Sequence, residues 1–350
     1  MTNIFQNAVR PHRFHLLLPL VLLLSAEAVL AQAAERAAPS DSPRSSPSGV
    51  HFSVGTTAGT RRGTLVELLF RQDRDGIYKK ISELDWQLLP AFYLSASAEL
   101  HYKAFDFSMH AGGFLPGRSG FMEDSDWLAL DDVKNIYSIS ENSISRSFFF
   151  GTEAAWNAPV ARWLRIRPSF GLECIQLSFS AENGYGWYGD ADHSATGQNV
   201  AWDSGNAQFF DKGRLYGITY TYGALFTWTG VSAVFLPAPA FNVRLSAEIS
   251  PFFYAEAVDH HLGRANGTFY MDAVPGFFAA GRAAVSLLFH ATERLTLTTA
   301  ASFTKIRRTF GTSYSTQEGE GGPYYEIGGY QGGTAGRWMD VTLSAAFRLF

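Results

Sequence analysis

Two short segments hold side chains that could activate a water molecule. The first contains Asp124 and Asp126, and the second contains Asp259 and His261. Residues two apart in an extended strand face the same side, so each pair would present both of its side chains to one face. A histidine oriented by an aspartate can act as a base, and two close carboxyls can share one proton. If both faces border one lumen, the four residues predict hydrolysis by an activated water.

Each segment also has a simpler interpretation. An Asp-x-Asp sequence is common in cation sites and solvated turns, and an Asp-x-His sequence is common in surface loops. His260 could replace His261 in any argument from spacing. Two histidines and several carboxylates could also bind zinc, but no other motif completes a zinc site. We therefore expect no metal here.

The chain around these segments alternates between apolar and polar residues. The clearest examples run over residues 94–103, 105–110, 243–250 and 295–298. Successive side chains of a strand face opposite sides, so this pattern gives each strand one apolar face and one polar face. We therefore predict an all-β chain.

Three features favour an antiparallel transmembrane β-barrel over a soluble β-sandwich. The apolar faces are small or aliphatic at mid-strand and aromatic near the strand ends, as the interfacial girdles of membrane barrels require. The polar faces carry charges that a wet lumen allows, and the N-terminus carries an export signal. In lipid, a closed barrel pairs every backbone group without leaving an edge. No later segment holds 18 consecutive apolar residues, so we expect no transmembrane helix.

Residues 1–31 predict a signal peptide. Arg10 and Arg13 make a positive segment, residues 16–24 are apolar apart from one proline, and small residues suited to cleavage follow. A retained membrane anchor is the alternative, but the apolar run is shorter than the roughly 20 residues of a spanning helix. Residues 32–49 are rich in Ser and Pro and predict a flexible leader, which leaves residues 50–350 as one barrel domain.

Turn-rich segments set the expected number of strands. Dividing the mature length into strand-plus-loop units gives about ten strands, and barrels of this kind normally have an even number. They also have short turns on one side and long loops outside, so we expect long extracellular loops. Long polar stretches occupy residues 183–189, 190–205, 263–267 and 312–336, and tighter turns are expected at Gly112-Gly113 and Pro116-Gly117.

The composition and the C-terminal residues add three constraints. The net charge of -4 gives no indication of a nucleic-acid partner. The single cysteine, Cys174, excludes an internal disulfide and a thiolate metal cluster. Residues 341–349 alternate and the chain ends on Phe350, which is similar to the assembly signal of outer-membrane barrels, although Arg348 holds a phase usually given to an apolar residue.

The order and spacing of four segments resemble the omptins, a family of ten-stranded outer-membrane endoproteases. The resemblance covers about residues 51–350 and is strongest before Trp127. It implies a peptidase in the cell outer membrane whose active site faces the cell exterior. The four segments are Ser53-Val54-Gly55-Thr56 with Gly59, residues 80–86 ending in Leu84-Asp85-Trp86, residues 122–127, and Asp259-His260-His261.

The resemblance also implies roles for individual residues. Asp124 and Asp126 become the aspartate pair, and Asp259 and His261 become the Asp–His dyad. In the family, a water between the histidine and an aspartate attacks the scissile carbonyl, with no metal and no acyl-enzyme. His261 would take the proton, Asp124 would help hold the water, and Asp126 would help bind the oxyanion. Met122 matches a position that lines the substrate pocket.

Two departures from the family concern substrate and lipid. The acidic residues of the family's pocket for a basic P1 side chain fall at Gly63 and Ala257, so the P1 preference stays open, with Glu67, Glu123 and Glu256 as candidates to compensate. Family members are activated by lipopolysaccharide bound through exterior basic side chains. Of two such positions, one is Glu182 here and the other falls in residues 221–224, which hold no basic residue.

The sequence therefore leaves three functions open. The leading one is an omptin-like endopeptidase that acts on surface-exposed proteins or peptides, without a cofactor and with activation by lipopolysaccharide as an open possibility. The second is a non-catalytic outer-membrane barrel that serves as an adhesin or receptor. The third is a small pore, although ten strands leave a lumen largely filled by side chains.

Overall fold

The computed structural model describes residues 8–9, 49–129, 132–189, 199–213, 217–262, 268–317 and 322–350. The predicted signal peptide and leader lie outside the described residues, except for residues 8–9 and Gly49. The predicted loop at 263–267 and most of the one at 190–205 also lie outside them. In the described part of the chain, no helix is long and apolar enough to cross a membrane.

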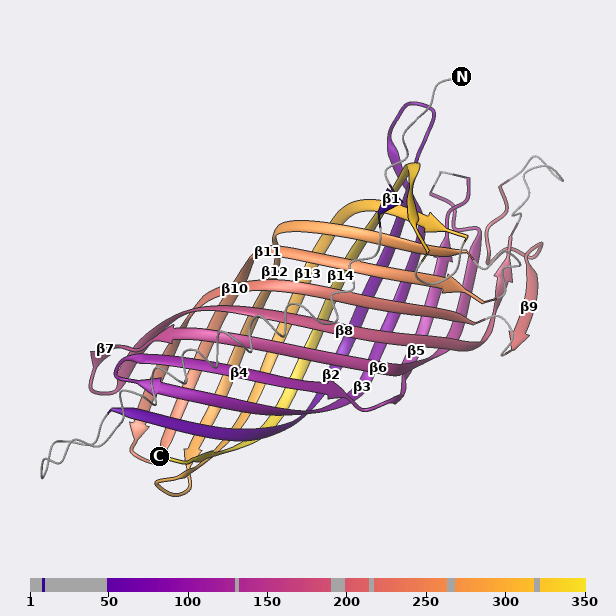
Figure 1. The fold of residues 1–350 in the computed structure, drawn as a ribbon. Coiled ribbons are helices and arrows are strands. Elements are labelled where there is room, and N and C mark those ends of the chain that lie inside the picture. The colour runs from indigo at the N-terminus through magenta and orange to yellow at the C-terminus, as the bar shows by residue number, and fades with distance from the viewer. Residues whose placement is uncertain are drawn as a thin grey trace, which may run out of the picture.

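Long antiparallel strands make up nearly all of the described chain (Figure 1). Most of the wall strands have 21 to 25 residues. The strands are β1 (Ala8–Val9), β2 (Val50–Gln72), β3 (Tyr78–Tyr102), β4 (Phe105–Phe114), β5 (Gly117–Asp126), β6 (Ile136–Trp156), β7 (Ala158–Ala161), β8 (Leu164–Tyr188), β9 (Gln208–Gly213), β10 (Ile218–Ala238), β11 (Phe241–His261), β12 (Phe269–His290), β13 (Leu295–Thr316) and β14 (Tyr324–Arg348).

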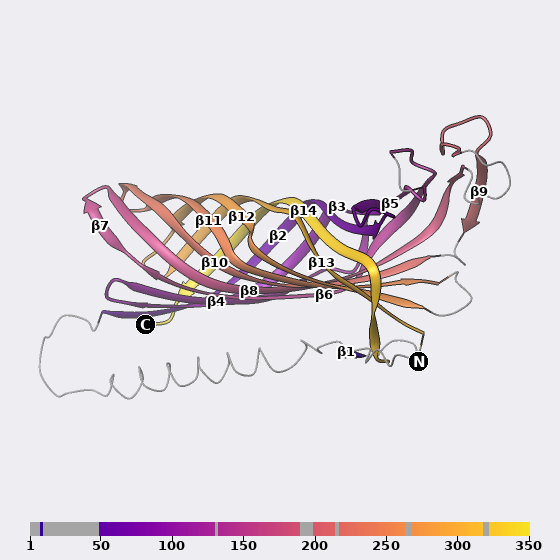
Figure 2. The ribbon, with the colours of Figure 1, turned by 90° about the horizontal axis from the view of Figure 1, so that it is seen from above.

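The wall closes on itself, as Figures 1 and 2 show. Strands β2, β3, β6, β8 and β10 to β14 pair around a ring, and the last strand, β14, pairs with the first wall strand, β2. Strands β4 and β5 both lie between β3 and β6 and act as one strand that is interrupted at residues 115–116. In the described chain the ring therefore has ten positions, which confirms the predicted barrel.

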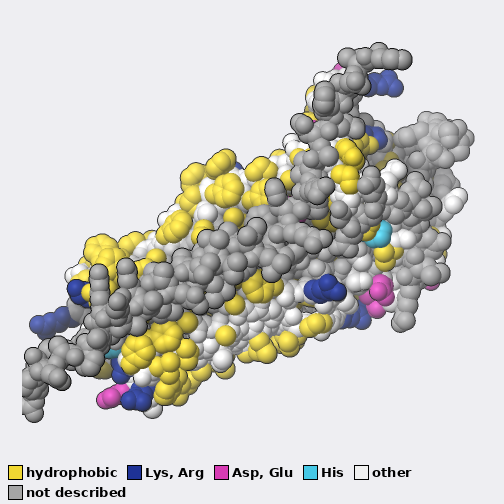
Figure 3. All heavy atoms as spheres, viewed as in Figure 1, with side chains coloured by type: hydrophobic (Ala, Val, Ile, Leu, Met, Phe, Trp, Pro, Cys, Tyr) yellow, Lys and Arg dark blue, Asp and Glu magenta, His cyan; other side chains and the backbone are white. Residues whose placement is uncertain are grey.

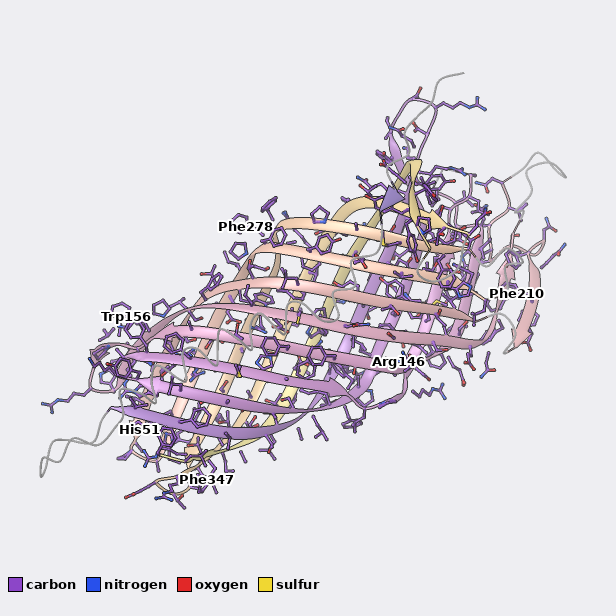
Figure 4. The ribbon with its side chains drawn as sticks, viewed as in Figure 1. His51, Arg146, Trp156, Phe210, Phe278 and Phe347 are labelled. Carbon is purple, nitrogen blue, oxygen red and sulfur yellow. The ribbon has the colours of Figure 1, made fainter. Side chains whose placement is uncertain are left out.

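Alternation of side chains explains the two faces of the wall. Leu94, Phe107, Leu245 and Leu343 are exposed, as expected for side chains that face lipid. Figure 3 shows hydrophobic side chains over much of the wall that faces the viewer. Figure 4 shows Trp156, His51 and Phe347 at the end of the barrel where the chain terminates. We call this the terminal end and the opposite end, where β9 lies, the loop end.

Side chains fill the lumen. Near the loop end, Trp86 stacks on Tyr220 with ring centroids 4.9 Å apart. Closer to the terminal end, the Arg282 guanidinium donates to Glu173 at 2.8 Å and to Glu248 at 2.5 Å. A lumen packed in this way is what a barrel of about ten strands is expected to have.

The seam between β2 and β14 carries an ion pair on its inner face. Nε of Arg61 donates to Oδ1 of Asp340 at 2.8 Å, and Nη2 donates to Oδ2 at 3.2 Å. Both side chains are about nine-tenths buried. The Arg61 guanidinium also lies over the rings of Phe114 and Trp338. The pair therefore joins the first and last wall strands from inside.

Several predicted loops are strands. β8 continues to Tyr188, β13 continues to Thr316, and β14 begins at Tyr324, so the predicted loops at 183–189 and 312–336 were largely wrong. Gly112 and Gly113 lie inside β4 rather than in a turn, and a Cβ on Gly112 would lie 2.3 Å from the carbonyl oxygen of Leu94. Beyond the lipid, both faces of a wall meet water, so pairing there needs no apolar alternation.

The C-terminal residue departs from the strand pattern because β14 ends at Arg348. The Phe350 carbonyl accepts a hydrogen bond from the Phe52 backbone N–H at 3.1 Å. The two rings stack with centroids 5.8 Å apart. The terminal aromatic residue thus packs against the start of β2 and does not continue the outward row of β14.

We predict that Asp340→Ala lowers the free energy of unfolding by about 3 kcal/mol, because it leaves the buried Arg61 charge without its partner. Urea unfolding of the refolded barrel in detergent measures this. Ser344→Ala is the matched control, since the Ser344 hydroxyl meets the Thr57 hydroxyl at 2.8 Å across the same seam. Loss of one neutral hydrogen bond costs about 1 kcal/mol. Equal losses in both variants would show that the ion pair has no special role.

Candidate functional site

The Asp259–His261 pair lies at the loop end of β11. His261 Nε2 lies 2.9 Å from Asp259 Oδ2. The His261 side chain is 21% exposed and that of Asp259 is 8% exposed. The two residues share one face of the strand, as their spacing predicts. Solvent can therefore reach the imidazole, while the aspartate that holds it is almost fully buried.

His260, the alternative from spacing, lies on the other face of the strand. Its ring stacks on Phe269 with a centroid separation of 3.9 Å. Since successive side chains point to opposite sides, His260 faces away from Asp259. The structure therefore separates two adjacent histidines that the sequence alone left equivalent.

The Asp124–Asp126 pair lies at the loop end of β5. Asp124 pairs with Leu84 of β3, and Asp126 pairs with Ser82, so both side chains share one face of their strand. Met122, two residues earlier on that face, is buried and pairs with Trp86. The predicted pocket residue thus lies below the aspartates, beside the packed lumen.

Glu67 of β2 links the two predicted pairs. Its carboxyl interacts electrostatically with Asp259 and Asp272, and also with Asp124. Asp259 and Asp124 therefore border the same part of the lumen, although they come from β11 and β5. Burial raises the pKa of Glu67 well above its usual value, and the nearby Asp259 and Asp272 raise it further. Glu67 lies on the loop side of the exposed apolar residues Met339 and Val341, because its register partner on β14 is Thr334.

Asp272 of β12 is a second buried acid that the motifs did not single out. It pairs with Ala257 of β11, and the Ser313 hydroxyl donates to its Oδ1 at 2.6 Å. Burial raises the pKa of Asp272 to about 7, against the effect of the Ser313 hydrogen bond. A Cβ on Gly332 of β14 would lie 2.1 Å from Asp272 Cγ, so only glycine leaves room for this carboxyl.

Polar atoms without partners surround these acids. In the described part of the chain, Asp259 Oδ1 and the Tyr220 hydroxyl are buried and make no hydrogen bond. Tyr220 is the register partner of Asp259, and its ring stacks on Trp86. Buried polar groups nearly always have partners, so these atoms can receive polar groups of a bound molecule.

The two positions where the family has acidic pocket residues, Gly63 and Ala257, have different surroundings. A Cβ on Gly63 would lie 2.1 Å from the Arg337 carbonyl oxygen and 2.5 Å from Trp338 Cα, so an acidic side chain does not fit there. Ala257 is buried but has an acid, Asp272, directly opposite it on β12. The carboxyl missing at this position is thus present on its cross-strand neighbour.

Of the three acids expected to compensate in the pocket, only Glu67 lies on the lumen face. Glu123 alternates with the lumen residues Met122 and Asp124, and it accepts a hydrogen bond from the Tyr137 hydroxyl at 3.1 Å. Glu256 alternates with the inward Ala257 and so belongs to the outer face. The sequence contains no local signal for Asp272, because it belongs to no motif and acquires its neighbours only across strands.

In the described residues, no group of three or more His, Cys, Asp or Glu side chains is arranged to hold a metal ion.

The closed antiparallel wall and its outward apolar residues define a membrane-type β-barrel, and the acids and histidine at one end are side chains of the kind that hydrolysis requires. The Omptin family model matches residues 48–343, and the chain belongs to this family.

Of two solved structures that match the chain, one shows the same architecture. The outer membrane protease OmpT from Escherichia coli matches with a TM-score of 0.72 and 14% identity, over 89% of this chain and 100% of that one. The translocator domain of the autotransporter NalP from Neisseria meningitidis matches with a TM-score of only 0.31 and 9% identity, over 95% and 98% of the two chains. None of the curated proteins matches.

We predict that the barrel loses stability as the pH rises from 5 to 8, and that Asp272→Asn loses less. An Asp has a pKa of about 3.9 in an unfolded chain. Because the folded pKa is higher, about 7, the neutral acid contributes stability that is full below about pH 4 and disappears as the pH rises through 7. Melting temperatures at the two pH values measure this. An unchanged pH dependence in Asp272→Asn would contradict the assignment.

Proposed function

We propose that this barrel is an outer-membrane endopeptidase that hydrolyses peptide bonds with an activated water. The observation that carries the proposal is the 2.9 Å contact between His261 and Asp259 at the loop end of a chain that belongs to the omptin family. Family membership supports a protease in the outer membrane. The dyad, the aspartate pair and the outward orientation of the site are the finer parts of the proposal.

His261 is the general base in this mechanism. Its Nε2 faces Asp259, so Nδ1 is the nitrogen that accepts the proton of the attacking water. Asp259 fixes the orientation of the ring and stabilises the imidazolium that forms. The partial exposure of His261 lets a peptide reach the dyad from the loop end.

The aspartate pair completes the reacting centre. Asp124 holds the water, and Asp126 helps bind the developing oxyanion. An oxyanion needs a hydrogen-bond donor, so a proton must reside among the carboxyls of this part of the lumen. Asp124 and Asp126 share this proton, as two close carboxyls can.

Glu67 and Asp272 recognise a basic P1 side chain in our proposal. Glu67 lies four residues after Gly63 on β2, and Asp272 lies directly across from Ala257. These two acids replace the acids that the family has at the positions of Gly63 and Ala257. An entering cation favours the ionised forms of both carboxyls, so it releases their protons. Binding of Lys or Arg at P1 therefore strengthens as the pH rises through about 7.

Partners and location follow from the same placement. The substrates are proteins or peptides at the cell surface, because the site lies at the loop end. Activation by lipopolysaccharide is part of the proposal, but not through the positions that the family resemblance suggested. Glu182 is acidic and receives a hydrogen bond from Ser180, and Thr221 meets Ser178 at 3.2 Å. Neither position attracts a phosphate.

A non-catalytic adhesin or receptor is the alternative function. The altered pocket acids favour it, since a binding barrel would be free to lose them. The packed lumen gives less support to a pore. Peptide cleavage by the refolded chain separates the alternatives, because neither a receptor nor a pore hydrolyses a peptide.

We predict that His261→Ala and Asp124→Asn each lower kcat/KM at least about 100-fold, the usual contribution of a general base or of a group that holds the nucleophile. Cleavage of a mixed peptide library by the refolded full chain, with and without lipopolysaccharide, measures this. His260→Ala is the matched control, since it removes the adjacent imidazole from the outer face, and it should keep the activity. Equal losses at 260 and 261 would count against the dyad, and no cleavage by the unaltered chain would remove the protease proposal.

We predict that peptides with Lys or Arg at P1 are cut faster, relative to peptides with an apolar P1, at pH 8 than at pH 6. Asp272→Asn and Glu67→Gln should each reduce this preference about tenfold and leave cleavage at apolar P1 less affected. A tenfold change corresponds to about 1.4 kcal/mol, which we assign to the loss of one charge contact. Specificity profiles of the three proteins test this. The pocket assignment fails if both variants retain the same P1 profile.

A further inference from the structure

A row of cations lies on the outer face of the β2–β14 seam. Lys305 of β13 and Arg337 of β14 are direct register partners, and Arg337 also pairs with Thr64 of β2. Arg62, two residues before Thr64, is the register partner of Met339. We call Arg62, Lys305 and Arg337 the seam cations. All three are exposed.

The seam cations repel one another. Directly opposite residues of an antiparallel pair have Cβ atoms about 5 Å apart, and like charges there are destabilising. In the described part of the chain, none of the three forms a salt bridge, whereas their neighbour Arg308 lies 3.8 Å from Glu83. The seam thus has a concentration of positive charge that no salt bridge among the described residues neutralises, although Asp85 of β3 interacts with Arg337 at longer range.

The row lies at the border of the apolar belt. Towards the terminal end, the next outward residues on the same strands are apolar and exposed, namely Phe303, Met339 and Val341. Towards the loop end come carboxylates, because Asp85 interacts with both Arg337 and Glu83. Outward side chains therefore change from apolar to cationic to acidic along the seam. Lipid phosphates lie at the first of these two borders.

We propose that the seam cations bind the phosphate of a membrane-lipid headgroup, which clasps the first and last wall strands together from outside. Arg337 and Arg62 stand on the two sides of the seam, so one phosphate between them contacts both strands. An arginine guanidinium can donate two parallel hydrogen bonds to phosphate oxygens. Each basic side chain near an anionic membrane surface also adds to the electrostatic attraction between the protein and the lipid. The acyl chains of the same lipid cover Met339 and Val341.

The ligand is a lipid phosphate and not free phosphate, because all three cations are exposed and lack a buried cradle. The apolar belt below them adds the contact that holds the headgroup in place. The site also differs from the positions that the family resemblance suggested for lipid contact. Glu182 and Thr221 lie on β8 and β10, about half of the ring away from the seam.

The inner and outer faces of the seam then complement each other. Inside, Arg61 meets its own carboxylate, Asp340. Outside, the adjacent Arg62 has a lipid phosphate as its counter-ion. This inference concerns the closure of the barrel and does not depend on the protease proposal, so its test measures stability.

The test compares melting of the refolded full chain in detergent alone and with added lipopolysaccharide, dephosphorylated lipopolysaccharide or inorganic phosphate. Lipopolysaccharide should raise the melting temperature by about 5 °C, and neither dephosphorylated lipopolysaccharide nor inorganic phosphate should raise it. The double variant Lys305→Gln/Arg337→Gln should lose most of this gain. Without lipid it should melt at the same temperature as the unaltered chain or higher, because it relieves the repulsion.

The matched control is Arg118→Gln/Arg146→Gln, which removes two exposed cations from β5 and β6. Figure 4 shows Arg146 on the wall away from the seam. This control should keep the full gain from lipid. An equal gain in the seam variant and the control would overturn the proposal, as would an equal effect of dephosphorylated lipid. A full gain from inorganic phosphate alone would overturn the choice of a lipid as ligand.

Discussion

Closure of the backbone hydrogen-bond ring is the constraint on which the rest of the structure depends. A membrane offers no water to an unpaired strand edge, so β2 must meet β14 across the whole lipid-facing height. That seam joins distant parts of the chain, since Arg61 and Asp340 are 279 positions apart. The protein reinforces it inside with the Arg61–Asp340 pair. Our lipid proposal adds a second reinforcement outside.

Closure also creates the chemistry of the lumen. Once ten strand positions surround a narrow interior, every inward side chain loses much of its water. Four acids from four strands, Glu67, Asp124, Asp259 and Asp272, share this interior above a floor of Trp86 and Tyr220. Burial raises the pKa of Glu67 and that of Asp272, so part of the cluster holds protons near neutral pH. A site that needs both a base and an acid benefits from this arrangement.

The departures from the family's pocket fit the same account. At Gly63 the backbone of β14 approaches too closely for any side chain, which ties the missing acid to the packing of the seam. Asp272 places a carboxyl opposite Ala257, and Gly332 leaves the space for it. Loss at one position and gain across the strand pair keep two acids near the dyad. In our proposal, the specificity and the closure of this barrel are therefore physically connected.

The sequence by itself determined what depends on neighbouring residues. Period-two alternation established the barrel strands, and the spacing of two residues placed Asp259 with His261 on one face. The sequence could not exclude His260, and it took residues 312–336 for a loop, because strand pairing beyond the lipid needs no apolar pattern. Only the tertiary structure brought Glu67 and Asp272 to the dyad. Their proximity depends on register across several strands, and register is set by closure of the whole ring, which no local pattern records.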